Sequence, residues 1–241
     1  MSIKSTPLSR NRTLVVVPAY NEEKSILDVV HRIRKTQPGI DVLVINDHST
    51  DGTEHILLQH RINHVSLPVN LGIGGAVQTG FLFARDHDYD VVVQVDGDGQ
   101  HPPEQITELT TMLTKCELDV VIGSRYLAGS RIVSSHARRL GGAVLGTLIF
   151  IATGKRVTDP TSGFRAYSRR VLDYLCWLYP QEYPEPISVM ELILQGYRIE
   201  EVPIIMEERR FGRSSITGLN VFFYMLKVMF SIIIVRIRRR K

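Results

Sequence analysis

Short runs of valine, isoleucine and leucine alternate with longer amphipathic stretches through the first half of the chain. The pattern predicts strands at 13–17, 42–46, 64–67, 91–95 and 120–122, and helices at 22–36, 51–59, 74–85 and 102–115. Within most of these strands, apolar residues follow one another without alternating with polar ones. Such strands are buried on both faces, which is typical of a parallel sheet covered by helices.

The pattern changes after Tyr126, where a segment rich in serine and arginine begins. It then predicts a helix at 140–152, a turn at 159–163, a strand at 164–167, a helix at 188–195, a strand at 199–205 and an apolar run at 221–235. We therefore expect an α/β fold. Its polar loops should gather at the carboxyl edge of the sheet, where open α/β sheets bind their ligands.

The chain has 241 residues, of which 44% are hydrophobic and 22% charged. This composition is that of a globular domain and excludes a disordered chain, a collagen-like repeat and a disulfide scaffold. Cys116 and Cys176 have no histidine or cysteine at zinc-binding spacing, which argues against a zinc cluster or a redox pair. The opening segment MSIKSTPLSRNR has no apolar core, so we expect no secretory signal.

The net charge of +4 is unevenly distributed along the chain. From residue 205 onward, seven arginines and two lysines outweigh two glutamates and give +7, so the first 204 residues sum to −3. The basic character therefore belongs to the tail. A nucleic-acid-binding groove on the folded domain is not expected.

Two carboxylates stand directly after the predicted strand at 91–95, in the segment VVVQVDGDGQH. Asp96 and Asp98 are separated by Gly97, and Gly99 follows, so the chain can bend until both carboxylates face one point. Hard divalent cations prefer such oxygen ligands and complete their shell with substrate phosphates. The segment predicts a Mg²⁺ or Mn²⁺ site beside a phosphorylated substrate. The alternative is a turn that merely ends the strand.

Two other predicted strands end in loops that suit a nucleotide. After the first come Pro18, which stiffens the loop, Tyr20, whose ring can cover a nucleobase, and Glu22, which can accept hydrogen bonds. Asp47 follows the strand at 42–46 and is placed to bind a base or ribose. The alternative for both loops is structural, with polar side chains capping the helices that follow.

The glycine-rich stretch NLGIGGA at 70–76 opens a predicted helix. A dinucleotide fingerprint that starts at Gly72 requires glycine at position 77, where Val77 stands, and would follow the first strand rather than the third. We therefore reject a nicotinamide-binding interpretation.

In this order, the segments resemble glycosyltransferase family 2, and most of all its dolichyl- and polyprenyl-phosphate sugar synthase branch. The resemblance rests on VVVPAYNEE, VINDHSTDGT, NLGIGGAVQTG, VQVDGDGQH, VIGSRY, DPTSGFRAYSRR and EVPIIMEERRFGRSS. It implies a GT-A fold, in which a mostly parallel, Rossmann-like sheet is flanked by helices. The expected domain spans 1–216, with a nucleotide-sugar-binding half at 13–126 and an acceptor-binding half at 127–216.

The resemblance also implies roles for single residues. Those lining the nucleotide pocket are Pro18, Tyr20, Glu22, Ile45 and Asp47, with Asp96 and Gly97 contacting the donor. Those holding Mg²⁺ or Mn²⁺ are Asp96, Asp98 and Gln100. Arg125 and Arg209 match positions that bind phosphate groups. One departure is Ser215, which stands where dolichyl-phosphate mannose synthases carry lysine.

The apolar run at 221–235 is shorter than the ~20 residues that a spanning helix needs, and five cations follow it between 236 and 241. We expect 217–241 to form a helix that lies in an anionic membrane surface, weakly anchored at the cytoplasmic face. The alternatives are a core helix or an interface with a small membrane-protein partner. Arg131, Arg138 and Arg139 suit an acceptor with a phosphate head and an apolar tail, the alternative being solvated charges.

The sequence thus predicts an enzyme that moves a sugar, with inversion, from a UDP- or GDP-linked donor to polyprenyl phosphate, using Asp98, Arg125 and Arg209. An ionised acceptor phosphate needs no strong base. An alternative acceptor is a hydroxyl of a growing glycan, which needs a base, and Glu185 is the candidate unless it lies in a rigid surface turn. A second alternative is a non-catalytic membrane subunit that binds nucleotide-sugar.

Overall fold

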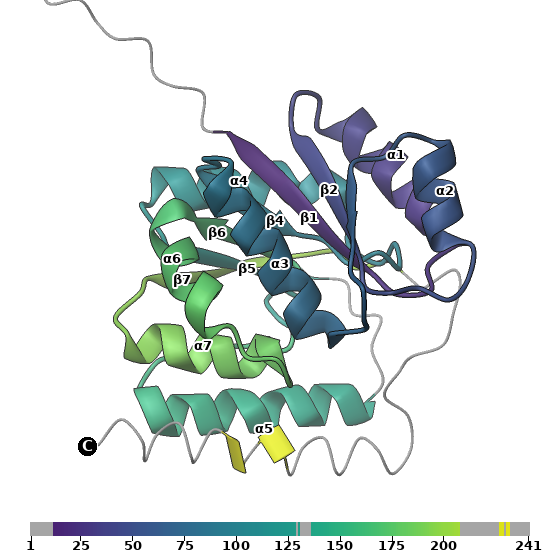
Figure 1. The fold of residues 1–241 in the computed structure, drawn as a ribbon. Coiled ribbons are helices and arrows are strands. Elements are labelled where there is room, and N and C mark those ends of the chain that lie inside the picture. Colours follow the sequence, from purple (N-terminus) through teal and green to yellow (C-terminus); the bar gives the residue numbers. More distant parts are fainter. Residues whose placement is uncertain (1–11, 129, 131–135, 208–226, 229, 232–241) are drawn as a thin grey trace, which may run out of the picture.

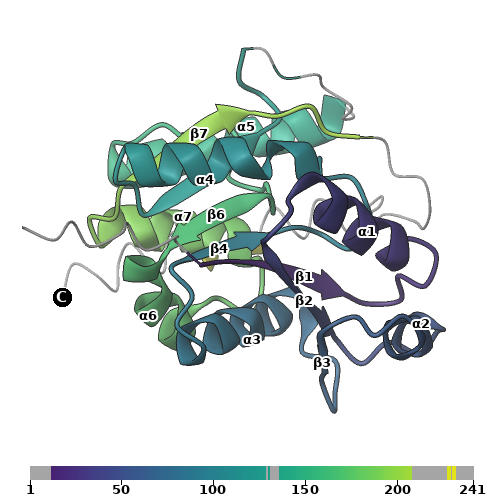
Figure 2. The same ribbon diagram turned by 90° about the horizontal axis from the view of Figure 1, so that it is seen from above.

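In the part of the chain that the structure describes, seven strands form a single sheet with helices on both faces (Figures 1 and 2). The structure is a computed structural model that describes residues 12–128, 130, 136–207, 227–228 and 230–231. The strands are β1 (Thr13–Ala19), β2 (Asp41–Asn46), β3 (His64–Ser66), β4 (Val91–Gln94), β5 (Val120–Ser124), β6 (Arg165–Ser168) and β7 (Ile199–Pro203). The helices are α1 (Ile26–Thr36), α2 (Thr53–Gln59), α3 (Gly72–Asp86), α4 (Ile106–Lys115), α5 (His136–Thr153), α6 (Arg169–Leu178) and α7 (Pro184–Leu194), with a 3-10 turn at Pro103–Gln105.

The sheet is mostly parallel, which confirms the prediction, and its strand order is β3-β2-β1-β4-β6-β5-β7. Only β6 runs against its neighbours, because it pairs antiparallel with both β4 and β5. β6 therefore begins at the edge where β1, β2, β4 and β5 end. This topology brings the turn at 159–163 to the same edge as the loops that follow those four strands.

Successive residues of the central strands pack into two separate cores. On β1, Leu14 and Val16 face the side covered by α3, α5, α6 and α7, whereas Val15 and Val17 face the side covered by α1, α2 and α4. All four side chains are buried. Burial of both faces is the physical reason that these strands are apolar without alternation.

Two helices begin at positions other than the predicted ones. α1 starts at Ile26 instead of residue 22, because Asn21 takes a left-handed conformation (φ 58°) and a turn intervenes. α7 starts at Pro184 instead of residue 188. Proline is tolerated there, since the first N–H groups of a helix have no partner within the helix.

The sequence pattern assigned no helix to residues 169–178, where α6 lies. This short helix is amphipathic and buries Val171, Leu172, Leu175 and Cys176. It packs beside α3, where Gln78 Nε2 donates to the Cys176 carbonyl at 2.9 Å. At ten residues, its pattern is too short to stand out from the neighbouring strand and loop.

The final apolar run is described at residues 227, 228, 230 and 231, which are helical. Val228 is fully buried in the core that contains Leu145 and Ile149 of α5, whereas Phe230 is exposed. Packing at Val228 favours the core-helix alternative at that residue, and the remainder of 217–241 lies outside the described residues. Among the helices that the structure describes, none combines the length and apolar character required to cross a bilayer.

Candidate active site

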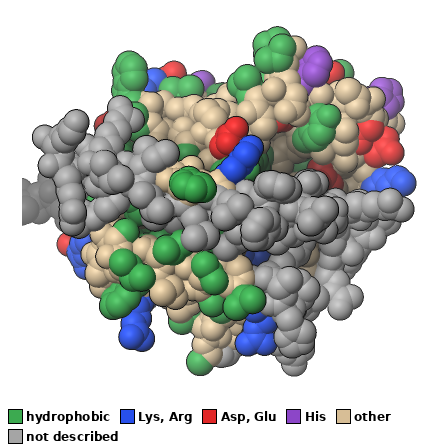
Figure 3. Space-filling view, turned by 90° about the horizontal axis from the view of Figure 1, so that it is seen from below, with side chains coloured by type: hydrophobic (Ala, Val, Ile, Leu, Met, Phe, Trp, Pro, Cys, Tyr) green, Lys and Arg blue, Asp and Glu red, His purple; other side chains and the backbone are tan. Residues whose placement is uncertain are grey.

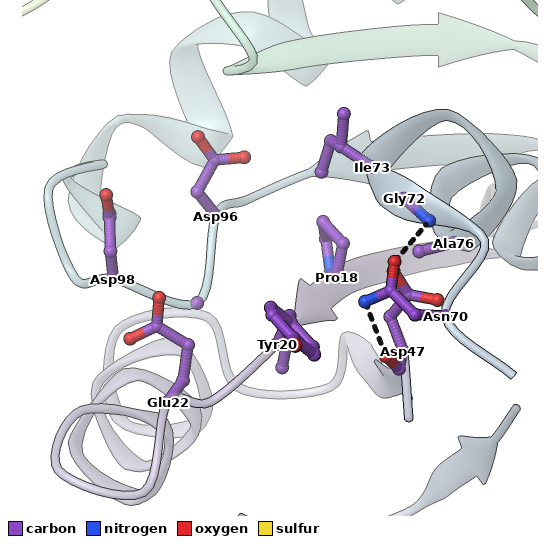
Figure 4. Close-up of a pocket in the computed structure, with 12 residues that line it drawn as sticks. Pro18, Tyr20, Glu22, Asp47, Asn70, Gly72, Ile73, Ala76, Asp96 and Asp98 are labelled. Carbon is purple, nitrogen blue, oxygen red and sulfur yellow. Dashed lines mark hydrogen bonds between the residues drawn. The ribbon is translucent and has the colours of Figure 1, made fainter. Parts of the chain in front are cut away.

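An open cleft of about 300 Å³ lies at the edge of the sheet where β1, β2 and β4 end (Figure 4). The residues that line it are Pro18, Ala19, Tyr20, Glu22, Asp47, Asn70, Gly72, Ile73, Ala76, Asp96, Gly97 and Asp98. It brings together seven residues predicted from the sequence, namely Pro18, Tyr20, Glu22, Asp47, Asp96, Gly97 and Asp98. Ile45 does not line the cleft. Its side chain is fully buried in the core beneath, two residues before Asp47 reaches the edge.

Asp47 and the loop before α3 form one end of the cleft. The Asp47 N–H donates to the Ala19 carbonyl at 2.9 Å, which continues the pairing of β1 with β2 past the strand ends. Asp47 Oδ1 accepts the Leu71 N–H at 2.7 Å, and Asn70 Nδ2 donates to the Asp47 carbonyl at 3.1 Å. The stretch at 70–76, to which the sequence assigned no role, thus forms a wall of the site and holds a buried carboxylate.

Asp96 and Asp98 form the other end of the cleft, on the turn that follows β4 (Figure 4). Asp98 is 8% exposed, and its Oδ1 accepts the Gln100 N–H at 3.0 Å. A side-chain carbon at Gly97 would stand 3.1 Å from the Pro18 carbonyl oxygen. The glycine between the two aspartates therefore permits the turn to approach the loop after β1 closely.

His101 supports Asp96 from the buried side. Its Nδ1 accepts the Asp96 N–H at 3.0 Å, and its Nε2 lies 3.6 Å from Asp96 Oδ2. Because Nδ1 is an acceptor, the neutral ring carries its proton on Nε2, facing the carboxylate. Burial raises the pKa of Asp96, His101 opposes this rise, and the charge of Asp98 adds to it, with a net rise above the usual value.

The turn at 159–163 closes against Asp96. A side-chain carbon at Gly163 would stand 3.0 and 3.1 Å from the two carboxylate oxygens of Asp96 and 3.2 Å from Gln94 Nε2. Gln94 is itself fully buried at the end of β4. Any larger residue at position 163 would displace the Asp96 carboxylate, so this position requires glycine.

Arg125, which follows β5, is bound to this turn by a forked ion pair. Its Nε and Nη2 donate to the two oxygens of Asp159 at 2.6 and 2.7 Å, and Nη2 also donates to Thr161 Oγ1 at 2.8 Å. Burial alone lowers the pKa of Arg125, but the hydrogen bonds and charge of Asp159 raise it above its ordinary value. The guanidinium predicted to bind phosphate is thus already paired with Asp159.

Glu201 of β7 holds the same turn from behind. Its carboxylate accepts the Thr158 N–H at 2.7 Å and the Asp159 N–H at 2.8 Å. Sequence reasoning assigned no role to Asp159 or Glu201. Both residues lie in segments that carry the family resemblance, DPTSG and EVP. The sequence alone does not show that these two distant segments contact each other.

Glu185 lies in the first turn of α7 and is half-buried, so the surface-turn alternative is wrong. Burial raises its pKa to about 6, against the opposing charge of Arg165, while Asp96 raises it further and Arg125 lowers it. Glu185 is not among the residues that line the cleft. A carboxyl group of this kind exchanges protons near neutral pH.

The remaining predicted residues lie beside the cleft or outside the description. Gln100 is half-buried, and its Nε2 donates to the Glu207 carbonyl at 3.3 Å, so it flanks the two aspartates without lining the cleft. Arg139 is exposed on α5, and Arg138 belongs to the same helix. Arg131 and Arg209 lie outside the described residues.

Asp96 and Asp98 fit a divalent cation that is shared with a substrate. No group of three or more histidine, cysteine, aspartate or glutamate side chains within the described ranges is arranged to hold an ion. Mg²⁺ commonly takes only one or two protein carboxylates and completes its shell with phosphates and water. Asp96 and Asp98, which line the same cleft, would supply these two carboxylates.

The fold and the cleft define the class of protein, an α/β domain with a mostly parallel sheet whose cleft, at the strand ends, carries two aspartates. Residues 14–176 match the family model for glycosyl transferase family 2, and the chain belongs to that family. This finding confirms the resemblance noted in the sequence.

Named relatives extend the comparison. Polyprenol monophosphomannose synthase of Mycolicibacterium smegmatis is 33% identical over 90% of this chain and 85% of its own length. Undecaprenyl-phosphate mannosyltransferase of Micrococcus luteus is 35% identical over 86% of this chain and 88% of its own. Glucosyl-3-phosphoglycerate synthase of Mycobacterium tuberculosis, solved with Mn²⁺, uridine diphosphate and phosphoglyceric acid, superposes with a TM-score of 0.71 at 22% identity, covering 94% of this chain and 78% of that one. The last comparison confirms the GT-A-like fold.

We predict that Gly163→Ala weakens Mn²⁺ binding by ~10–100-fold, because the added methyl displaces the Asp96 carboxylate. Mutation of a residue that orients a metal ligand typically lowers metal affinity by this factor. Titration of Mn²⁺ followed by electron paramagnetic resonance, with nucleoside diphosphate present, measures the change. The control is Asp28→Ala, a change to alanine at an exposed position of α1 that does not line the cleft. Equal Mn²⁺ affinity in the wild type and Gly163→Ala would contradict the assignment of Asp96.

Proposed function

We propose that this chain transfers a sugar, with inversion, from a nucleoside-diphosphate sugar to a polyprenyl phosphate. The observation that carries the proposal is the pair Asp96 and Asp98 at one end of a cleft whose other end suits a nucleoside. Two relatives described above, the polyprenol monophosphomannose synthase and the undecaprenyl-phosphate mannosyltransferase, support the acceptor class. In the reaction, an acceptor phosphate oxygen bonds to the anomeric carbon as the bond from that carbon to the nucleoside diphosphate breaks.

Asp96, Asp98 and the nearby Gln100 would hold the Mg²⁺ or Mn²⁺. When bound, this cation neutralises negative charge on the departing diphosphate. The protein contributes the geometry, since Gly97 and Gly163 let both aspartates approach the phosphate end of the cleft while Asp47 and Tyr20 hold the nucleoside. The acceptor phosphate is ionised at neutral pH, so the attack needs orientation more than proton removal.

We predict that the purified chain, supplied with membranes and a panel of labelled UDP- and GDP-sugars, moves label into organic-extractable lipid. Asp98→Ala should lower this transfer at least ~100-fold, because it removes a charge that the site uses to stabilise the leaving group. The matched control is Asp28→Ala, on the exposed face of α1. Label remaining in water with every donor would overturn the proposed acceptor. Absence of any turnover would favour the non-catalytic alternative.

A second candidate function, transfer to a glycan hydroxyl, is favoured by Glu185 alone. Its pKa of about 6 and its place in the first turn of α7 would suit a general base. As a base, Glu185 works only above its pKa, so activity on a hydroxyl would rise as pH passes through 6. With a phosphate acceptor, this carboxyl group is not required to take up a proton.

We predict near-normal turnover for Glu185→Gln under the first proposal, since glutamine keeps the shape of the protonated acid. A loss beyond ~100-fold, together with wild-type activity that rises with pH through 6, would establish the hydroxyl acceptor instead. Transfer rates measured between pH 5 and 8 make the comparison. Glu182→Gln, an exposed residue nearby, is the matched control.

We also propose that the chain docks on an anionic membrane through the outer face of α5. Leu140, Val144 and Ile151 share one side of this helix and are 68%, 37% and 74% exposed. Exposed Arg139 lies near one end of the helix and exposed Arg156 just past the other. Figure 3 shows hydrophobic side chains gathered on this face, with lysine and arginine side chains around them. Apolar insertion flanked by cations suits the lipid headgroup region.

We predict that the chain floats with vesicles containing anionic lipid and that Leu140→Glu combined with Ile151→Glu reduces the bound fraction ~10-fold or more, because two anchors become repelled charges. The control is Leu58→Glu, an exposed leucine on α2. Unchanged flotation of the double variant would show that another surface binds the membrane.

A further inference from the structure

The chain after β7 returns to the turn that carries the two aspartates. The Glu207 N–H donates to the Gln100 carbonyl at 2.9 Å, and Gln100 Nε2 donates to the Glu207 carbonyl at 3.3 Å. Residue 207 therefore holds Gln100 by both its main chain and its side chain. The Gln100 N–H in turn donates to Asp98 Oδ1 at 3.0 Å, so the position of this carboxylate depends on the same contact.

The bond between Gln100 and the Glu207 carbonyl decides which atom of the Gln100 amide is left for a cation. A carbonyl oxygen only accepts hydrogen bonds, so the part of the amide that faces it is the amino group. The amide oxygen, Oε1, is on the other branch of the planar amide. Because a hard divalent cation binds oxygen, residue 207 sets the amide in the orientation that a metal ligand requires.

An ion pair with Arg32 of α1 fixes Glu207. Arg32 Nη1 donates to Glu207 Oε2 at 3.1 Å and Nη2 donates to Glu207 Oε1 at 2.5 Å, so the pair is forked. The two side chains are 23% and 31% exposed. The hydrogen bonds from Arg32 to Glu207 are the main reason that the pKa of Arg32 lies above its ordinary value. A forked pair fixes the direction of its partners as well as their distance.

Helix α1 is a firm support for this pair, because its end is bonded to the segment that follows the aspartates. Gln37 is 7% exposed, and its Nε2 donates to the Pro103 carbonyl at 2.8 Å. Thr107 Oγ1 donates to Gln37 Oε1 at 2.8 Å. The ion pair therefore joins the chain after β7 to a helix that is itself held beside the turn at 96–100.

We propose that Arg32 and Glu207 are positioning residues for the divalent cation: their ion pair holds residue 207 against Gln100, which keeps the Gln100 amide oxygen and the Asp98 carboxylate in place. This inference rests on the proposed function, in which Mg²⁺ or Mn²⁺ lies between these groups and the diphosphate. It goes beyond that function because neither Arg32 nor Glu207 is among the residues that line the cleft.

Charge alone predicts opposite effects for the two partners. Arg32→Gln removes a positive charge near the aspartates, which by electrostatics strengthens cation binding, whereas Glu207→Gln removes a negative charge, which weakens it. Loss of a positioning contact weakens cation binding in both variants. Arg32→Lys keeps the charge but cannot form the fork with both oxygens of Glu207, so it isolates the geometry of the pair.

The measurement is titration of the full chain with Mn²⁺, followed by electron paramagnetic resonance, with UDP or GDP present. We expect Arg32→Gln and Glu207→Gln each to weaken Mn²⁺ binding ~10-fold, and Arg32→Lys to weaken it by a smaller factor. The variant that combines Arg32→Gln with Glu207→Gln should bind Mn²⁺ no more weakly than the weaker single variant, since both act through one contact.

Two matched controls accompany these variants. Arg34→Gln makes the same change at an exposed arginine of α1, and Glu104→Gln removes a more exposed carboxylate that also pairs with Arg32, at 3.3 Å. Both should leave Mn²⁺ affinity nearly unchanged, because exposed charges contribute little. Thermal unfolding of every variant establishes that it is folded.

Unchanged or tighter Mn²⁺ binding by Arg32→Gln would overturn the inference, and so would a lowered melting temperature without a change in Mn²⁺ affinity. If either glutamine variant does not fold, wild-type Mn²⁺ affinity in Arg32→Lys would contradict the inference. Failure of the wild type to bind Mn²⁺ with either nucleotide would overturn both the inference and the metal of the proposed function. The expected Mn²⁺ affinities without transfer of label to lipid would support the inference and contradict the proposed acceptor.

Discussion

A buried ion pair between Arg125 and Asp159 joins the two parts of the chain that meet at the cleft. The pair is forked, Asp159 is fully buried, and Glu201 holds the backbone of the same turn. Removing one partner of such a pair costs about 3–5 kcal/mol, because the other charge is left buried and uncompensated. The turn that the pair anchors carries Gly163, which lies against the Asp96 carboxylate. The position of the acidic pair therefore depends on this contact.

The cleft concentrates negative charge, and the protein only partly compensates for it. Asp96 and Asp98 line one end of the cleft, and burial raises the pKa of both Asp96 and Glu185. Arg165 offsets part of the charge from below. It is fully buried and donates to the Pro160 carbonyl, the Ser162 carbonyl and Ser188 Oγ. A diphosphate entering such a site is repelled unless a cation lies between, which is consistent with the divalent metal of the proposed reaction.

Close packing links the glycine-rich start of α3, at the Asp47 end of the cleft, to the loop before α7. A side-chain carbon at Gly74, in the first turn of α3, would stand 2.5 Å from the Pro180 carbonyl oxygen and 2.6 Å from that of Gln181. The same segment continues through Tyr183, which is left-handed (φ 52°), into α7 and Glu185. The glycine-rich stretch thus lets α3 touch the loop that positions Glu185. This contact gives the stretch a structural reason that the nucleotide fingerprint did not supply.

The sequence by itself determined the mostly parallel sheet, the two aspartates after β4 and most of the residues that line the cleft. These features are local: apolar runs define the strands, and Pro18, Tyr20, Glu22 and Asp47 follow directly where strands end. Helix α6 and the start of α7 were not predicted, since a short amphipathic pattern and two prolines give weak local signals.

Only the tertiary structure decided which polar residues meet. Arg125 pairs with Asp159, 34 residues away, and Glu201 reaches Asp159 across 42 residues. Ile45 carries a motif position but is buried in the core, because β2 continues to Asn46 and the chain reaches the cleft only at Asp47. Arg125 and Asp159 meet because β6 lies between β4 and β5 in the sheet. The order of strands in a sheet cannot be deduced from the hydrophobic pattern of the sequence.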